Sequence, residues 1–288
     1  MKKILIAVLS AVTIFAPMQV AKANDERVVA IIDTAIDSSK FPSVIYEACF
    51  TQNSSCPNGQ KFMEGKGSAN SFGRDGALKP LVGPVWANSV NFSHPIYHGL
   101  KMVTASNITN PNIKIVFVRI ADVTSSGNSI NTGQSLSQAF DWVSKNASKY
   151  SIDAVSVSQS RVNWTTCPTD LVVSNAINSL QTQNIPAFIA TGNDKLKDKV
   201  GFPACVNGAT GVGAMTLDGL MLQAVTNSGP GLDVVAVGDI RKALNNTYDI
   251  TGTSVATAVA ATKYVGQTSL FNQFISGLTK FLTYPFIR

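Results

Sequence analysis

Short apolar runs alternate with longer stretches of helical periodicity along most of the chain. Six runs are rich in Val, Ile and Ala without strict polar alternation, which is typical of strands buried on both faces of a parallel sheet. They predict strands at Val28–Ile32, Ile113–Val118, Ala154–Ser158, Ala187–Thr191, Gly211–Met215 and Leu232–Val237. The longer patterns predict helices at Gly99–Ser106, Ser135–Tyr150, Thr169–Gln183 and Thr253–Tyr264. This alternation predicts an α/β fold, doubly wound, with a mostly parallel sheet and helices on both faces.

The first residues do not follow this pattern. A basic start is followed by the apolar run Ile4–Phe15, and Ala21-Lys22-Ala23 places small residues where a signal peptidase reads the chain. We therefore predict a secretory signal peptide over residues 1–23, one domain over residues 24–288, and a secreted or periplasmic protein. A short membrane anchor that stays attached is the alternative.

Charge excludes one class of partner. The formal net charge is +6, and removing the signal segment with its three lysines lowers it to about +3. No cluster of Lys and Arg with interleaved aromatic residues remains, so nucleic-acid binding is not indicated. The apolar stretch Leu270–Phe286 is interpreted as a helix packed on the sheet, with membrane contact as the alternative. We expect a monomer without stable membrane insertion.

Four cysteines are present, at positions 49, 56, 167 and 205. An even number in an exported chain indicates two disulfides, and four cysteines allow three connectivities. We favour Cys49–Cys56, which closes the polar loop Thr51–Ser55, together with Cys167–Cys205. A zinc site is disfavoured because the spacings lack close cysteine pairs and the chain has only two histidines. We expect no metal and no cofactor.

Polar residues at strand ends are the first candidates for chemistry, because sites in such sheets lie at the carboxyl ends of the strands. Asp33 directly follows the first predicted strand, where it either caps a turn or orients a catalytic base. Asp37 lies further into the loop. Of the two histidines, His98 begins an apolar helix, whereas His94 precedes a proline and is interpreted as a loop residue.

Two further positions complete the candidate set. Asn193 follows a predicted strand and is either a turn residue or a side-chain amide aimed at developing negative charge on a carbonyl oxygen. Ser254 follows Gly252-Thr253, and Thr253 can cap the helix, which leaves Ser254 in its first turn. There the helix N-terminus and the Ser254 N–H favour an oxyanion nearby.

These residues occur in a distinctive order, within motifs that resemble those of the subtilisin-like serine peptidases (subtilases). The aspartate motif is Val29-Ala30-Ile31-Ile32-Asp33-Thr34-Ala35-Ile36-Asp37, the histidine motif is His98-Gly99, the oxyanion strand is Ile189-Ala190-Thr191-Gly192-Asn193, and the nucleophile motif is Gly252-Thr253-Ser254-Val255-Ala256. The order Asp, His, Ser is that of the subtilisins. The resemblance extends from about Val28 to Tyr264.

This resemblance implies a serine endopeptidase whose catalytic triad is Asp33, His98 and Ser254, with Asn193 in the oxyanion hole. It also implies that Ser158, Gln159, Ser160 and Gly192 bind a peptide or protein substrate. The alternative is a catalytically impaired relative, a pseudopeptidase that binds peptides in the same cleft. An esterase of the α/β-hydrolase type is disfavoured, because neither its Gly-x-Ser-x-Gly motif nor its residue order is present.

Overall fold

The computed structural model describes residues 26–70, 98–123, 129–131, 133–163, 165–244 and 250–266. The predicted signal peptide, His94 and the stretch Leu270–Phe286 lie outside these residues.

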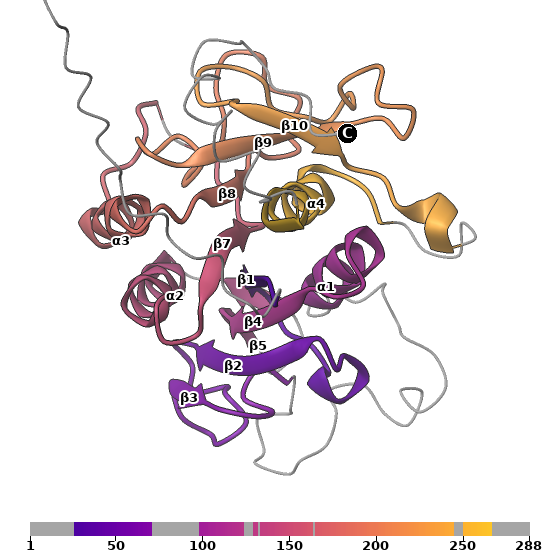
Figure 1. The fold of residues 1–288 in the computed structure, drawn as a ribbon. Coiled ribbons are helices and arrows are strands. Elements are labelled where there is room, and N and C mark those ends of the chain that lie inside the picture. The colour runs from indigo at the N-terminus through magenta and orange to yellow at the C-terminus, as the bar shows by residue number, and fades with distance from the viewer. Residues whose placement is uncertain are drawn as a thin grey trace, which may run out of the picture.

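In the described part of the chain, one sheet of eight strands forms the middle layer in the order β10-β9-β8-β7-β1-β4-β2-β3 (Figure 1). Neighbouring strands pair in parallel except β2 and β3, which are antiparallel. The strands are β1 Val28–Asp33, β2 Val44–Phe50, β3 Phe62–Glu64, β4 Lys114–Arg119, β7 Ile152–Val157, β8 Ala187–Ala190, β9 Thr210–Met215 and β10 Val234–Val237. A separate antiparallel pair consists of β5 Ala121–Val123 and β6 Ser129–Asn131.

All six predicted strands are present, with ends shifted by at most two residues. The prediction missed β2, which contains the acidic residue Glu47 between apolar neighbours. Glu47 is buried, and its two carboxylate oxygens accept N–H bonds from Gly67 at 2.8 Å and Ala69 at 3.0 Å. A buried carboxylate is tolerated when such donors satisfy it, and a hydrophobic pattern does not reveal those donors.

Helices cover both faces of the sheet, as expected for the doubly wound class (Figure 1). Two of them, α2 and α3, lie together on one face, and the other two, α1 and α4, lie on the opposite face. Their bounds are α1 His98–Thr109, α2 Gly133–Asn146, α3 Leu171–Thr182 and α4 Thr253–Gly266.

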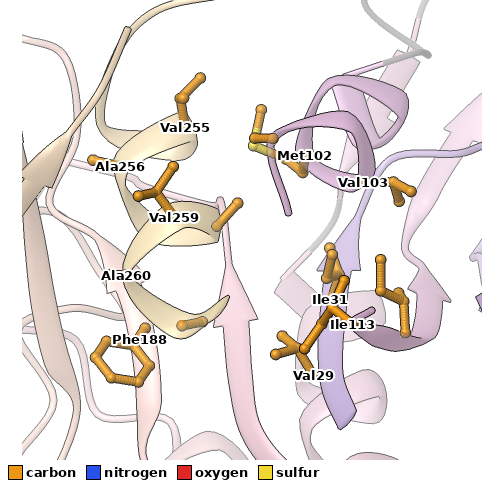
Figure 2. Packing of buried hydrophobic residues seen from close by; sticks show 14 of the residues in the cluster. Val29, Ile31, Met102, Val103, Ile113, Phe188, Val255, Ala256, Val259 and Ala260 are labelled. Atoms are coloured by element: carbon orange, nitrogen blue, oxygen red, sulfur yellow. The ribbon is translucent and has the colours of Figure 1, made fainter. Parts of the chain in front are cut away.

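Two apolar cores follow from the alternation of side chains along the strands. In β1, Val29 and Ile31 contribute to the core beneath α1 and α4, whereas Ala30 and Ile32 contribute to the core beneath α2 and α3. Figure 2 shows the first core, where Met102 of α1 faces Val255 and Val259 of α4 above the side chains of β1.

The central helix of this core is α4, which contacts α1 and the strands β1, β7, β8, β9 and β10. Every residue from 253 to 262 is buried, as expected for a helix surrounded by protein on all sides. Alanine is the most frequent residue in it, and its small side chain lets the backbone approach the sheet closely.

The helices differ from their predicted bounds by up to four residues at an end, and two of these differences have a local reason. Helix α2 ends at Asn146, four residues early, and the chain turns until Ser151, whose φ of 54° is not helical. Helix α3 begins at Leu171 because the carboxylate of Asp170 accepts the N–H groups of Val172 and Val173. That acceptor arrangement is an N-cap, which places Asp170 just outside the helix.

The two predicted disulfides, Cys49–Cys56 and Cys167–Cys205, are the ones in the structure. The first closes the loop between β2 and β3. The second joins the segment between β7 and α3 to the segment between β8 and β9.

Candidate active site

The candidate residues gather at the carboxyl edge of three adjacent strands, β1, β7 and β8. Asp33 ends β1, Ser158 follows β7, and Asn193 lies three residues after the end of β8. Strands lie about 4.8 Å apart, so β8 and β1 are separated by about 10 Å. Such an edge of an open α/β sheet is where ligands bind.

Asp33 contacts His98 directly. Its Oδ1 lies 2.8 Å from His98 Nδ1 and also accepts the N–H of Thr34 at 2.7 Å. Because an ionised carboxylate only accepts hydrogen bonds, this pairing assigns the hydrogen to Nδ1 and leaves Nε2 as the basic nitrogen. Of the two interpretations of Asp33 made from the sequence, this contact favours the one in which the carboxylate orients an imidazole.

Asp37 has a different role. Its carboxylate accepts the N–H of Ser39 at 3.2 Å and the hydroxyl of Ser39 at 2.6 Å, and so caps the short helix Ser38–Lys40. Its contacts are local to that turn.

The start of α1 places His98. The N–H of Gly99 donates to Thr34 Oγ1 at 2.8 Å, which ties the first turn of the helix to the end of β1. A Cβ on residue 99 would lie 2.5 Å from Phe117 Cζ and 2.9 Å from the carbonyl oxygen of Ala35, so only glycine fits there. This close approach brings the His98 imidazole over Asp33, with 32% of its side-chain surface still exposed.

Opposing influences act on the pKa of His98. Burial lowers it, while the charge of Asp33 and the hydrogen bond to Asp33 raise it, and nearby Lys101 lowers it slightly. The net result is a pKa above the ordinary histidine value. An adjacent carboxylate favours the imidazolium form in this way.

Asn193 is bonded to the start of α4, next to Ser254. Its Oδ1 accepts the backbone N–H of Thr253 at 3.0 Å and the hydroxyl of Thr253 at 3.0 Å. With the amide oxygen occupied by these donors, the Nδ2 hydrogens are directed elsewhere. Helix α4 begins at Thr253 itself, one position earlier than a Thr253 cap would give, and Ser254 is its second residue, 8% exposed.

The two helix starts lie at the same edge of the sheet. The start of α1 is bonded to the end of β1, the start of α4 is bonded to the residue after β8, and α1 and α4 pack against each other. The structure therefore brings the pair Asp33–His98 and the pair Asn193–Ser254 to the same carboxyl edge, from four segments far apart in the sequence.

The residues predicted to bind substrate also lie together. Ser158, Gln159 and Ser160 follow β7, and the Ser160 hydroxyl donates to the carbonyl of Thr191 at 3.3 Å. Gly192 has a φ of +106°, and a Cβ on it would lie 2.4 Å from Ser160 Oγ. These residues therefore form one contiguous part of the edge, beside Asn193.

Sequence reasoning missed the partners that hold these groups. Thr34 anchors the helix of His98, and Thr253 holds the amide of Asn193. Each is a threonine directly beside a candidate residue, and that adjacency is the only signal in the sequence. A hydroxyl donates and accepts, so its partner cannot be predicted from its position alone.

Among the described residues, no group of three or more His, Cys, Asp or Glu side chains is arranged to hold a metal ion. None of the helices in the described ranges is long and apolar enough to cross a membrane.

Comparison with protein families gives one match, to the model described as "Subtilase family", over residues 90–275. The match covers more than half of the chain. No curated protein is significantly similar in sequence.

Several solved structures with a similar fold are described as proteases. Proteases from Pseudoalteromonas arctica share 18% identity at a TM-score of 0.60, over 84% of this chain and 77% of theirs. A cold-adapted subtilisin-like serine proteinase shares 20% identity at a TM-score of 0.51, over 88% of this chain and 78% of its own. The prenylagaramide maturation protease PagA shares 17% identity at a TM-score of 0.52, over 87% of this chain and 78% of its own. At these identities the likeness shows the fold.

Proposed function

The chain belongs to the subtilase family, and from this premise we propose that it is a serine endopeptidase with Asp33, His98 and Ser254 as its catalytic triad. The observation that supports the proposal most is the 2.8 Å contact between Asp33 Oδ1 and His98 Nδ1 at the start of α1, packed beside the helix that begins with Thr253-Ser254.

In the proposed reaction, Ser254 Oγ attacks the carbonyl carbon of the scissile peptide bond while His98 Nε2 takes the hydroxyl proton. The C–N bond then breaks, and His98 returns the proton to the leaving amine. The product is an ester between Ser254 and the acyl half of the substrate, which water hydrolyses with His98 again as the base. Asp33 holds the imidazole in the required tautomer and stabilises its charged form.

The negative charge on the carbonyl oxygen needs donors. We assign this role to Nδ2 of Asn193 and to the backbone N–H of Ser254 at the start of α4, where the helix dipole also favours an anion. The bonds from Thr253 support this assignment, because they occupy the amide oxygen of Asn193 and so leave the amide nitrogen pointing away from Thr253.

We place the reaction outside the cytoplasm, in the periplasm or the medium. The predicted signal peptide supports this, as do the two disulfides, which form and persist in oxidising compartments. The proposed substrate is a peptide or protein segment lying along Ser158, Gln159, Ser160 and Gly192.

The test is to incubate the purified, folded protein with casein, with a fluorogenic peptide and, separately, with a serine-directed fluorophosphonate. We expect hydrolysis of the first two and covalent labelling of Ser254 by the third. Peptide binding with neither turnover nor labelling would identify a pseudopeptidase instead, and would overturn the proposal.

Replacing Asn193 by Ala is expected to lower kcat by about 10²–10³-fold with little change in KM, because the lost donor contacts the oxygen only once it becomes an oxyanion. Steady-state kinetics with a fluorogenic peptide measure this. A loss confined to KM would assign Asn193 to substrate binding and contradict its oxyanion role.

The rate should also depend on pH through His98. The base is active only when neutral, and the pKa of His98 lies above its ordinary value. The acid limb of the kcat/KM profile is therefore expected to have its midpoint above about pH 6.5, the reference value for histidine. A midpoint clearly below that value would show that the group that titrates is not the imidazole bonded to Asp33.

A further inference from the structure

Asn227 lies in the segment between β9 and β10, far in sequence from the candidate active-site residues, and is fully buried. A buried side-chain amide costs free energy unless its polar atoms are bonded. The hydrogen bonds of Asn227 therefore indicate the role of this residue.

Every bond of the Asn227 side chain goes to the loop that follows β8. Its Nδ2 donates to the carbonyl of Thr191 at 3.0 Å and to Asp194 Oδ2 at 2.9 Å. Its Oδ1 accepts the backbone N–H of Asp194 at 2.9 Å and that of Leu196 at 3.1 Å. A side-chain amide has two N–H donors and an oxygen that accepts two hydrogen bonds, so every hydrogen-bonding position of the Asn227 side chain is used.

The backbone of the same residue adds a fifth bond, from its N–H to the carbonyl of Gly192 at 3.0 Å. Asn227 thus contacts the loop at Thr191 and Gly192 before Asn193, and at Asp194 and Leu196 after it. Asn193 itself is exposed and bonded through its amide oxygen to Thr253. Asn227 therefore holds the loop both before and after Asn193. The side-chain amide of Asn193 is held separately, by Thr253 at the start of α4.

We infer that Asn227 is a positioning residue that sets where the Asn193 amide stands relative to Ser254. The inference rests on the proposed function, in which that amide stabilises the oxyanion. A group aimed at the transition state loses most of its effect when it is displaced, and a misplacement of about 1 Å can cost about 10²-fold in rate.

The site also explains why asparagine stands there. An aspartate has the same shape but no N–H, so an oxygen would face the carbonyl of Thr191 and the carboxylate of Asp194. The space between the Asn227 amide and the loop is also restricted, because a Cβ on Gly192 would lie 2.4 Å from Asn227 Nδ2. Gly192 is therefore needed for the amide of Asn227 to reach the loop.

The test is a double-mutant cycle measured with a fluorogenic peptide. Asn227→Ala is expected to lower kcat by about 10²-fold with little change in KM. In a protein that already carries Asn193→Ala, the same change is expected to lower kcat by less than about threefold, because the group through which it acts is gone.

A matched control separates positioning from stability. Val173→Ala truncates a fully buried side chain of α3 in the core on the opposite face of the sheet, and should lower the Tm without lowering kcat. If Asn227→Ala lowers kcat by the same factor with and without Asn193, its effect is general and the inference is overturned.

If Asn227→Ala does not fold, Asp194→Ala is the second variant. Asp194 is exposed, and its carboxylate accepts one of the two Nδ2 bonds. We expect it to lower kcat by about three- to tenfold in the wild-type background and not in the Asn193→Ala background. Equal losses in both backgrounds would overturn the inference.

The two proposals fail in different ways. If the wild type hydrolyses peptides and Asn193→Ala is impaired while Asn227→Ala is not, only the role of Asn227 is wrong. If the wild type is inactive, the proposed function is wrong, and backbone hydrogen exchange over residues 191–196 still tests the positioning. Faster exchange in Asn227→Ala supports it, and unchanged exchange overturns it.

Discussion

Ser254→Ala is expected to lower kcat for peptide hydrolysis by about 10⁶-fold. Without Oγ no acyl-enzyme forms, so both halves of the reaction are lost. A small residual rate should remain, because Asn193 and the backbone N–H of residue 254 still stabilise an oxyanion formed by direct attack of water. Labelling by a fluorophosphonate should disappear entirely.

The variant is expected to fold and bind like the wild type. Ser254 is buried near the start of a helix rich in alanine, where alanine is the most favourable residue. Peptide affinity should therefore be retained, which equilibrium binding measures. Ser148→Ala, on an exposed turn far from the carboxyl edge, is the control and should keep full activity. Turnover by Ser254→Ala at more than a few per cent of the wild-type rate would assign the nucleophile to another residue.

Asp33→Asn is expected to lower kcat by about 10⁴-fold while leaving the backbone unchanged. The amide that replaces the carboxylate no longer stabilises the imidazolium, and it can offer an N–H to Nδ1, which places the imidazole hydrogen on the wrong nitrogen. Because the charge and hydrogen bond of Asp33 raise the pKa of His98, their removal should also move the acid limb of the remaining activity to lower pH.

Asp37→Asn is the matched control, since it makes the same chemical change four residues away. Asn caps a short helix about as well as Asp, so neither the rate nor the pH profile should change. Measuring kcat of the wild type, Asp33→Asn and Asp37→Asn across a pH series gives both the loss of rate and the position of the acid limb. An acid limb of Asp33→Asn that coincides with that of the wild type would show that Asp33 does not control the protonation of His98.

The strands of the central sheet could be predicted because they are buried on both faces. Residues 28–32 are apolar at every position and β-branched at all but Ala30, and such a short run between polar neighbours favours a strand. Strand β2 could not be predicted in the same way, because Glu47 interrupts its pattern and its bonding partners lie about 20 residues further along the chain. Strand β3 has three residues, too few for a pattern.

The candidate site shows the same division between local and distant information. Asp33, His98, Asn193 and Ser254 could each be chosen from local context, as a strand end or a helix start, and from the resemblance to a family. The residues that hold them could not. Asn227 bonds to a loop more than 30 positions earlier, and the bond from Thr253 to Asn193 joins residues 60 positions apart. These pairings exist only once the sheet has assembled.

The bond between Asn193 and Thr253 also bears on biosynthesis. A ribosome delivers Asp33 and His98 early, the loop of Asn193 later, and the segment of Asn227 and helix α4 last. Asn227, which bonds to the loop, and Thr253, which bonds to Asn193, both follow that loop in the chain, so a chain that ends before α4 lacks the bonds that fix the amide and lacks the proposed nucleophile, Ser254. Under the proposed mechanism, proteolytic activity therefore requires a chain that has been translated past α4.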